Sequence, residues 1–310
     1  MTIDILLSTY RGEKFVAEFI GSLARQTRRG FRLLVRDDGS DDATAAVVRD
    51  SVAAADIPAV FVPSSGEHLG VLRSFGDLLT MSSASYVMFA DQDDIWRPDK
   101  VEGMMTLMRE AETIHGEDTP ILLHSDLRVC AADGAVVADS LRRYQRLSPR
   151  DDRLTALLIQ NSVTGCAMMI NRALRQLVRL PIPDEAVCHD WYLALVAAAF
   201  GRTVFSDTPY VDYRAHGANV FGPQKYCAAD WFRVFRSGRL SLRRRLFLPQ
   251  RQAGAFLRQY GDSLNAAERQ AVEAWAGIGS RSKFGRIAAC LKFGFRKNTL
   301  LRTAGMWWAI

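Results

Sequence analysis

The chain has 310 residues, of which 48% are hydrophobic and 24% are charged. These are ordinary values for a globular protein, and they exclude an intrinsically disordered chain, a collagen-like repeat and a coiled coil made only of heptads. Its five cysteines are widely spread without a C-x-x-C pair, which argues against a disulfide framework or zinc site and favours a reducing compartment. No stretch of about 18 uncharged apolar residues is present, so we expect no membrane-spanning helix, and the N-terminus does not read as a signal peptide.

The net charge of +6 conceals an uneven distribution. Residues 224–310 carry 17 basic and 4 acidic side chains, whereas the first 223 residues carry 23 basic and 30 acidic ones. An acidic body is not typical of a nucleic-acid-binding protein, so we expect no nucleic acid among the partners. The basic C-terminal quarter predicts that this part of the chain faces something anionic.

The N-terminal third of the chain alternates between strand-like and helix-like segments. Short apolar runs predict strands over residues 3–8, 31–36, 59–62 and 86–90. Helical spacing of apolar residues follows each of the first three strands, with Asp41 or Asp42 as a cap for the second helix and residues 71–81 as the third. The order β-α-β-α-β-α-β indicates an α/β fold with a mainly parallel sheet and helices on both faces.

Beyond Lys100 the pattern becomes less regular. We expect a helix over residues 101–111, a strand over 121–126, a strand over 164–170 entered through a tight turn, an apolar helix over 191–200, and two separate short strands over 203–205 and 210–214. From Ala228 onward helix predominates, and Pro249 predicts a break in it. The sequence therefore predicts an α/β domain followed by a helical extension.

Polar, turn-forming residues follow three of the predicted strands directly. They are Thr9-Tyr10, Asp37-Asp38 and Asp91-x-Asp93. Parallel sheets with helices on both faces bind ligands in the crevice at the carboxyl ends of their strands. We therefore expect these three clusters to converge on one edge of the sheet.

The segment Asp91-Gln92-Asp93-Asp94 brings three carboxylates together at the end of a buried strand. A divalent cation with a preference for oxygen ligands would offset their repulsion. In an extended chain Asp91 and Asp93 point the same way and Gln92 the opposite way. The alternative is a solvated acidic turn in which Asp94 caps a helix. An EF-hand loop is excluded, because Trp96 stands where that loop needs glycine.

The other polar candidates each have a structural alternative. Asp37-Asp38 reads equally well as a turn followed by a helix cap, and Tyr10 could cover the core or stack on a base. Asp190 could belong to a helix N-terminus or accept a proton from an acceptor hydroxyl. His216 could be a loop residue or a ligand.

Together, these segments resemble glycosyltransferase family 2, the inverting transferases of GT-A fold that use nucleotide sugars. The resemblance covers about residues 1–222 and rests on motifs that occur in this order: Ser8-Thr9-Tyr10, Val35 to Asp42, Phe89 to Lys100, and His189-Asp190-Trp191. Thr164-Gly165-Cys166 and the segment from Tyr213 to Asn219 are most similar to a rhamnosyltransferase-like branch.

The resemblance implies a donor site on the first three motifs. Thr9 and Tyr10 would line the nucleobase pocket, with Tyr10 stacking on the ring. Asp38 would accept a hydrogen bond from the N3–H of uracil or thymine. Arg73 would lie near the nucleotide, and Asp91 would face the ribose and the metal.

The resemblance also implies a metal site and an acceptor side. Asp93, with Asp91, would ligate Mg²⁺ or Mn²⁺ bridging the diphosphate, and His216 would complete the metal or diphosphate site. Asp190 would be the general base. We place Thr164, Gly165 and Trp191 on the acceptor side.

We therefore expect a GT-A glycosyltransferase domain over residues 1–222 and a basic helical extension over residues 223–310. The expected reaction is inverting transfer of rhamnose from a dTDP donor, or of a hexose from a UDP donor, onto a surface polysaccharide or lipid-linked glycan. One alternative is a sugar-nucleotide pyrophosphorylase. Such an enzyme needs a glycine-rich, basic phosphate loop after the first strand, and the segment Arg11-Gly12-Glu13-Lys14 is only a weak match to it. The other alternative is an inactive scaffold in a glycan-assembly complex.

The basic extension interleaves cationic and apolar side chains, for example in residues 240–248 and 283–297. Such amphipathic, cationic helices fit an anionic membrane surface, and the expected location is cytoplasmic, at the inner face of the plasma membrane. The alternative is a solvated helical cap that only packs on the catalytic domain.

Overall fold

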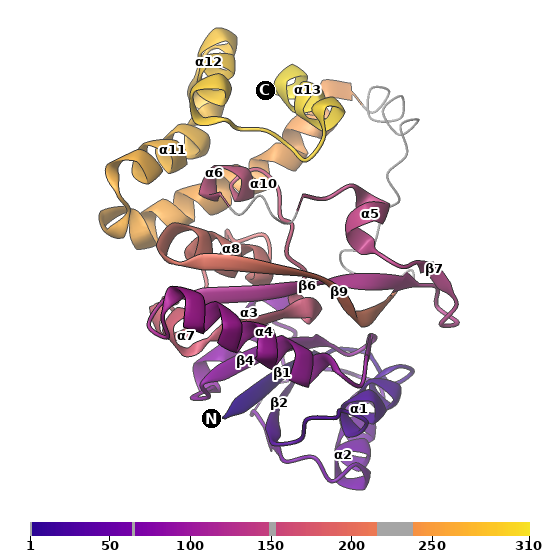
Figure 1. Ribbon diagram of the computed structural model, residues 1–310. Coiled ribbons are helices and arrows are strands. Elements are labelled where there is room, and N and C mark those ends of the chain that lie inside the picture. The colour runs from indigo at the N-terminus through magenta and orange to yellow at the C-terminus, as the bar shows by residue number, and fades with distance from the viewer. Residues whose placement is uncertain (1, 64–65, 149–152, 216–237) are drawn as a thin grey trace.

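The computed structural model describes residues 2–63, 66–148, 153–215 and 238–310 (Figure 1). Within these ranges one nine-stranded sheet has the order β3-β2-β1-β4-β8-β6-β9-β5, and β7 pairs with β6. Its strands are β1 (Ile3–Thr9), β2 (Phe31–Asp37), β3 (Ala59–Phe61), β4 (Tyr86–Asp91), β5 (Ile95–Trp96), β6 (Ile121–Cys130), β7 (Val136–Ala138), β8 (Met168–Asn171) and β9 (Arg202–Arg214).

Six of the described strands run in the same direction. β1 pairs in parallel with β2 and β4, β2 with β3, and β6 with β9. β8 is antiparallel to both β4 and β6, so it joins the two parallel groups without changing their common direction. The prediction of a mainly parallel sheet is confirmed.

Helices cover the sheet and continue beyond it. In the described residues they are α1 (Val16–Ala24), α2 (Thr44–Ala54), α3 (Val71–Met81), α4 (Lys100–His115), α5 (Leu141–Gln145), α6 (Leu154–Leu157), α7 (Arg172–Leu177), α8 (His189–Phe200), α10 (Gly238–Tyr260), α11 (Ala266–Ala276), α12 (Lys283–Phe293) and α13 (Leu300–Ala309), with 3₁₀ turns η1 (Gly165–Ala167), η2 (Gly261–Ser263) and η3 (Ile278–Ser280). The bounds of α3 match the prediction.

The sheet separates two apolar cores. Successive side chains of a strand point to opposite faces, so Ile5 and Leu7 of β1 join the core beneath α1 and α4, while Leu6 joins the core beneath α3 and α8. The same alternation in β4 sends Phe89 to the α3–α8 side. Because both faces are covered, the apolar runs of β1 and β4 are almost completely buried.

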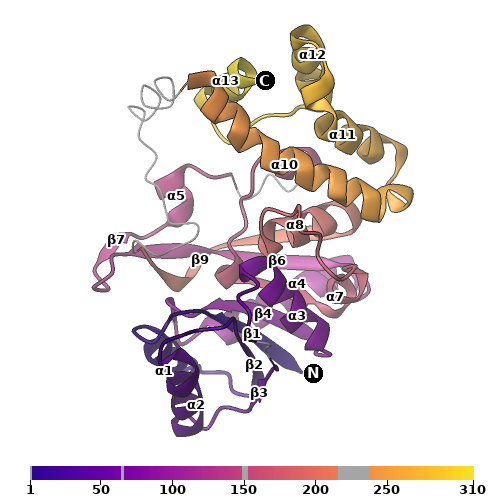
Figure 2. The same cartoon turned by 180° about the vertical axis from the view of Figure 1, so that it is seen from behind.

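The C-terminal helices share a core with the α/β domain. Phe256 of α10 and Trp275 of α11 are fully buried in the apolar cluster that also contains Tyr192 of α8. The hydroxyl of Tyr192 donates to Gln259 Oε1 at 2.7 Å. Figure 2 shows α10 crossing next to α8, with α11 to α13 stacked beyond it. The extension therefore packs on the domain, and the predicted boundary at residues 222/223 lies outside the described residues.

Two local predictions and one of the alternatives were wrong. Pro249 lies inside α10, which continues because side chains before and after it, Leu246 and Phe256, are packed in the same core. The two expected strands over residues 203–214 form one strand, β9, whose register shifts against β6 absorb the irregular residues between them. Asp94 does not cap a helix, since α4 begins only at Lys100.

No helix in the described residues is long and apolar enough to cross a bilayer. Cys130, Cys166, Cys188 and Cys290 are buried free thiols, while Cys227 lies outside the described residues.

Candidate active site

The ends of β1, β2 and β4 meet at one edge of the sheet, as predicted. Thr9 lies opposite Asp37 in the β1–β2 pair, and Ser8 lies opposite Asp91 in the β1–β4 pair. The backbone N–H of Asp38 continues the β1–β2 ladder by donating to the Thr9 carbonyl at 2.8 Å. The three polar clusters are therefore neighbours.

Gln92 holds two of these loops together. Its side-chain amide donates to the Tyr10 carbonyl at 2.8 Å and accepts from the Tyr10 N–H at 3.0 Å. A Cβ at Gly12 would lie 2.1 Å from Gln92 Oε1, so the β1–α1 loop needs glycine at this point. This contact was not predicted, and Gln92 and Asp93 form a turn, not the extended chain that the predicted alternation of side-chain directions assumes.

The two aspartates at the end of β2, Asp37 and Asp38, have different hydrogen-bond partners. Asp37 is committed to the turn, because its carboxylate accepts from Ser40 N at 2.9 Å, from Ser40 Oγ at 2.7 Å and from Thr9 Oγ1 at 2.9 Å. Thr9 is fully buried in this arrangement. The turn thus fixes the backbone from which Asp38 projects.

Asp38 is a buried carboxylate with partners on both oxygens. Its Oδ1 accepts from the Leu69 N–H at 2.9 Å and its Oδ2 from the Gly70 N–H at 2.8 Å. The guanidinium of Arg36, equally buried, donates to Oδ1 as well. Two buried charges are tolerated when they pair and their remaining hydrogen-bonding capacity is used, as happens here.

His68 occupies the space in front of Tyr10 and Asp38. Its ring lies 4.0 Å from the Tyr10 ring, centroid to centroid, and its Nδ1 lies 3.0 Å from Asp38 Oδ2. Tyr10 is half-exposed and the His68 side chain is 52% exposed. The resemblance predicts a nucleobase in contact with the same two side chains, and in this structure the tilted His68 ring makes those contacts.

Arg73 lies on the outer side of α3. Its guanidinium forms a two-point ion pair with Asp184, with N–O distances of 2.8 and 2.6 Å. Both side chains are more than half exposed. The arginine in contact with Asp38 is therefore Arg36, and Arg73 links α3 to the loop that precedes α8.

The carboxylates after β4 lie in an environment that disfavours their charge. Burial, together with the charges of Asp93 and Asp190, raises the pKa of Asp91 to about 7. The start of α8 lies beside β4, since the ring of His189, which precedes Asp190, is 5.3 Å from the Phe89 ring, centroid to centroid. Burial and the neighbouring Asp93 also raise the pKa of Asp94 well above its usual range.

Lys100 supplies a buried cation beside these groups. Its ammonium donates to the Cys166 carbonyl at 2.5 Å and lies 3.2 Å from the ring centroid of Trp96. Burial lowers the pKa of Lys100 to about 7, although the negative charges of Asp94 and Asp91 act to raise it. Lys100 closes the motif that begins at Asp91, but its position beneath the carboxylates was not predicted.

Asp94 and Cys166 form the inner wall of this cluster. Asp94 Oδ1 accepts from the Arg214 N–H at 3.1 Å, and the Asp94 side chain is fully buried. Possible ligand atoms of Asp91, Asp94 and Cys166 all lie within 4.8 Å of one another. Burial raises the pKa of the Cys166 thiol well above its usual range, which makes it a poor metal ligand, since the thiolate is the ligating form.

The residues present fit a hard divalent cation on the outer side of the cluster. Asp91 and Asp93 are half-buried at the carboxyl end of β4, whereas Asp94 is fully buried. Mg²⁺ and Mn²⁺ prefer carboxylate oxygens, and a cation would remove the repulsion that raises the pKa of Asp91. His216, the third predicted ligand, lies outside the described residues.

Asp190 is held in place at the start of α8. Its Oδ2 accepts from the Gly165 N–H at 3.0 Å, and its Oδ1 accepts from Asn161 Nδ2 at 3.3 Å and from the Trp191 N–H. The carboxylate is in the first turn of the helix, where the helix dipole favours negative charge. It is half-buried and remains accessible from the edge of the sheet.

His189 and Gly165 determine the position of Asp190. The His189 ring is buried between Phe75, at a centroid distance of 4.1 Å, and Phe89, at 5.3 Å. Burial lowers the pKa of His189 to about 4, so the ring is neutral at physiological pH. A Cβ on Gly165 would lie 2.8 Å from His189 Nε2, and only glycine lets the two segments approach this closely.

The other two residues predicted on the acceptor side lie close to Asp190. Thr164 is half-buried and precedes η1, and its carbonyl accepts from the Ala167 N–H. Trp191 is buried, and its indole Nε1–H donates to the Leu157 carbonyl at 2.6 Å. The Trp191 ring therefore supports α8 from within the core.

The comparisons with known proteins agree with this geometry. The sequence model of the family described as Glycosyl transferase family 2 matches residues 4–178, and the chain belongs to that family. Fold and family together define a glycosyltransferase domain of the GT-A type, which confirms the predicted fold and family.

One relative and two solved structures illustrate the likeness. An uncharacterised protein of Mycobacterium tuberculosis (strain ATCC 25618 / H37Rv) is 24% identical over 222 residues, which are 71% of this chain and 60% of that protein. The chain thus spans about 60% of the length of this relative. S. aureus TarS 1-349 in complex with UDP-GlcNAc has a TM-score of 0.59 at 16% identity, covering 100% of this chain and 89% of that one. The mannosyltransferase PcManGT from Pyrobaculum calidifontis, in complex with GDP-Man and Mn²⁺, has a TM-score of 0.53 at 16% identity, covering 93% and 73%.

Proposed function

We propose that the chain transfers a sugar from a nucleoside diphosphate donor to a hydroxyl acceptor with inversion at the anomeric carbon. The observation that carries the proposal is the meeting of Asp91, Asp93 and Asp190, from two distant parts of the sequence, at the strand edge where Asp38 also lies. Such a set offers a cation site for the diphosphate and a separate carboxylate for the acceptor.

The donor nucleotide binds at the end of β1 and β2. The base stacks on Tyr10 and donates its N3–H to Asp38, which favours uracil or thymine. In the structure, His68 contacts both Tyr10 and Asp38. The arriving base needs the same contacts and therefore displaces His68. The backbone N–H groups of Leu69 and Gly70 and the Arg36 guanidinium orient the Asp38 carboxylate for that bond.

Asp91 and Asp93 would hold Mg²⁺ or Mn²⁺ at the donor site. When bound, the cation neutralises the negative charge that develops on the leaving group. Lys100 and Asp94 support the carboxylates from inside the domain and do not reach the substrate.

Asp190 acts as the general base. The acceptor hydroxyl gives its proton to the Asp190 carboxylate while its oxygen forms a bond to the anomeric carbon. The bond between that carbon and the diphosphate oxygen breaks on the opposite face, and the nucleoside diphosphate leaves with the electron pair. One displacement of this kind inverts the configuration and needs no carboxylate nucleophile.

The donor is rhamnose linked to dTDP or a hexose linked to UDP, and the acceptor is a surface polysaccharide or a lipid-linked glycan. The likeness of Thr164-Gly165-Cys166 to the rhamnosyltransferase-like branch supports the first donor. The UDP-GlcNAc complex of TarS, a protein of the same fold, supports the second.

A thermal-shift panel of UDP- and dTDP-sugars, each with and without Mn²⁺, tests the proposal. We expect stabilisation that requires both the cation and one of the two nucleotides, because binding to the folded state alone raises the melting temperature. If none of the nucleotides raises the melting temperature, the proposal is contradicted and a scaffold without a donor site is favoured.

A further inference from the structure

Four large apolar side chains project from the two last helices. Phe284 is 86% exposed and Leu291 65% exposed on α12, while Leu300 is 89% and Leu301 44% exposed on α13. Phe284 and Leu291 are seven residues apart and therefore lie on the same face of α12. Folded domains seldom leave several such side chains together in water unless the surface has a partner.

The charged residues of the segment that carries these side chains are all basic. Residues 281–310 contain seven basic side chains and no acidic one. Arg281, Lys283 and Lys292 are exposed. Lys283 is next to Phe284 and Lys292 is next to Leu291, so positive charge borders the apolar face of α12 on both sides.

Both helices lie at one end of the molecule. In Figures 1 and 2, α12 and α13 form the end opposite to α2, on the far side of α10 from the sheet. A flat partner could therefore contact them without covering the strand edge that carries Asp38 and Asp91.

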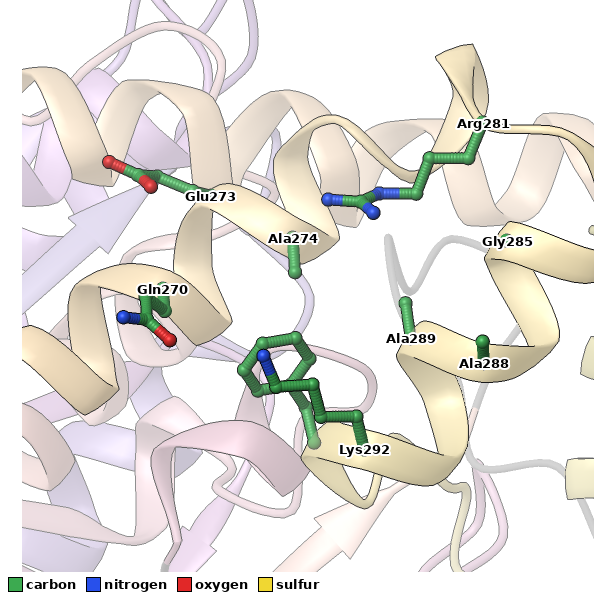
Figure 3. Close-up of a pocket in the computed structure, with 9 residues that line it drawn as sticks. Gln270, Glu273, Ala274, Arg281, Gly285, Ala288, Ala289 and Lys292 are labelled. Carbon is green, nitrogen blue, oxygen red and sulfur yellow. The ribbon is translucent and has the colours of Figure 1, made fainter.

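A cavity of about 350 Å³ lies between α11 and α12 on the same end. Figure 3 shows the side chains of Arg281 and Lys292 extending toward it. Its acidic lining residue, Glu273, is already 3.0 Å from the guanidinium of Arg269. The cavity is therefore suited to a phosphate group.

We propose that α12 and α13 form a docking surface for an anionic phospholipid bilayer. Phe284, Leu291 and Leu300 enter the boundary between headgroups and acyl chains, and the surrounding basic side chains contact lipid phosphates, one of them in the cavity between Arg281 and Lys292. Apolar insertion combined with attraction to anionic headgroups is the physical basis of binding by helices that lie in the interface.

The charge distribution favours an anionic bilayer over other partners. A second copy would bring the same seven positive charges against the first, without acidic residues from this segment to balance them. A polyanion without an apolar part would leave Phe284 and Leu300 in water. An anionic bilayer satisfies both features of the surface. The proposal does not depend on the proposed sugar transfer, and it is tested without measuring activity.

Vesicle co-sedimentation of the full chain tests the surface, with phosphatidylcholine vesicles that contain or lack phosphatidylglycerol. We expect binding to the anionic vesicles only, weakened by salt. The double substitution Phe284→Ser with Leu300→Ser should weaken binding at least about tenfold, since each side chain loses a large buried apolar area. Lys283→Gln with Lys292→Gln should weaken it about fivefold per lysine.

A matched control uses two apolar side chains that are exposed elsewhere. Ile114, 74% exposed on α4, and Met81, 51% exposed at the end of α3, are replaced together by serine, and binding should remain at the wild-type level. The proposal is overturned by equal binding to both vesicles, by no binding, or by unchanged binding of the Phe284/Leu300 variant. It is also overturned if that variant changes the oligomeric state in the absence of vesicles, which would identify a contact between copies.

Discussion

The strand edge and the helical end of this molecule use charged residues in opposite ways. At the strand edge two cations are buried and have fixed partners: Arg36 pairs with Asp38, and Lys100 donates to the Cys166 carbonyl. At the helical end, residues 281–310 carry basic side chains without acidic ones, and several of them are exposed beside apolar groups.

This difference predicts how each region responds to change. A buried pair has a defined geometry, and removal of one partner leaves an uncompensated charge in a medium of low polarity. Exposed charges act together as a field that salt screens and that single substitutions reduce only gradually.

The substitution Asp190→Asn should cause the largest loss in the rate of sugar transfer. Loss of a general base lowers the rate by roughly 10²–10⁴-fold, because the acceptor hydroxyl then has no group to take its proton. The rate is measured as release of nucleoside diphosphate in the presence of acceptor. Donor binding, measured by calorimetry, should stay within about twofold of wild type. Comparable turnover in the variant would remove Asp190 from the mechanism.

The substitution Arg36→Met should destabilise the fold strongly. It leaves the buried Asp38 without its cation, and breaking a buried pair costs about 3–5 kcal/mol of the free energy of unfolding. Denaturant titration measures this quantity. The matched control is Arg73→Met, which breaks the exposed pair with Asp184 and should leave the free energy of unfolding nearly unchanged. Equal costs for the two variants would contradict the contrast between buried and exposed pairs.

His189 should make stability depend on pH. Burial lowers its pKa to about 4 from 6.5, so between these values the unfolded chain binds a proton that the folded chain excludes. This contribution to stability is complete above about pH 6.5 and is lost as the pH falls toward 4, amounting to about 3 kcal/mol.

The variant His189→Gln lacks the pH-dependent contribution of His189 to the free energy of unfolding. The difference in free energy of unfolding between wild type and variant should therefore decrease by about 3 kcal/mol from pH 7 to pH 4, when both are followed by urea titration. A difference that does not change with pH would show that the buried ring does not exclude the proton.

The substitution His68→Ala should tighten nucleotide binding. His68 now contacts Tyr10 and Asp38, so a nucleotide has to displace it, and removal of a competitor raises the apparent affinity. We expect an improvement of about fivefold for UDP or dTDP in calorimetry, since the contacts made by an exposed ring are worth about 1 kcal/mol. Glu67→Ala, at the exposed neighbouring position, is the control. Weaker binding of His68→Ala would mean that His68 holds the nucleotide.

The sequence predicted the convergence of the three strand ends because periodicity determines the strands and parallel order places their ends together. It did not predict the contacts across the edge. Arg36 directly precedes Asp37 and Asp38 in the sequence, but only the fold shows that it is buried and pairs with Asp38. His68 and Gln92 act through residues 30 or more positions away. Such pairs depend on tertiary packing, which no local pattern records.

The errors have the same origin. Pro249 is a local signal for a helix end, but the packing of α10 against the core overrides it. Asp94 reads as a helix cap because of its position before a helix, whereas its buried bond to Arg214 arises from β9, 120 residues later.

The most direct test of the account is a crystal structure of the Asp190→Asn variant with donor sugar nucleotide and Mn²⁺. We predict the base on Tyr10 with its N3 beside Asp38, His68 displaced, and Mn²⁺ within roughly 2.0–2.3 Å of carboxylate oxygens of Asp91 or Asp93. The anomeric carbon should face residue 190. A nucleotide bound away from this edge, or a cation held only by Asp94 and Cys166, would contradict the account.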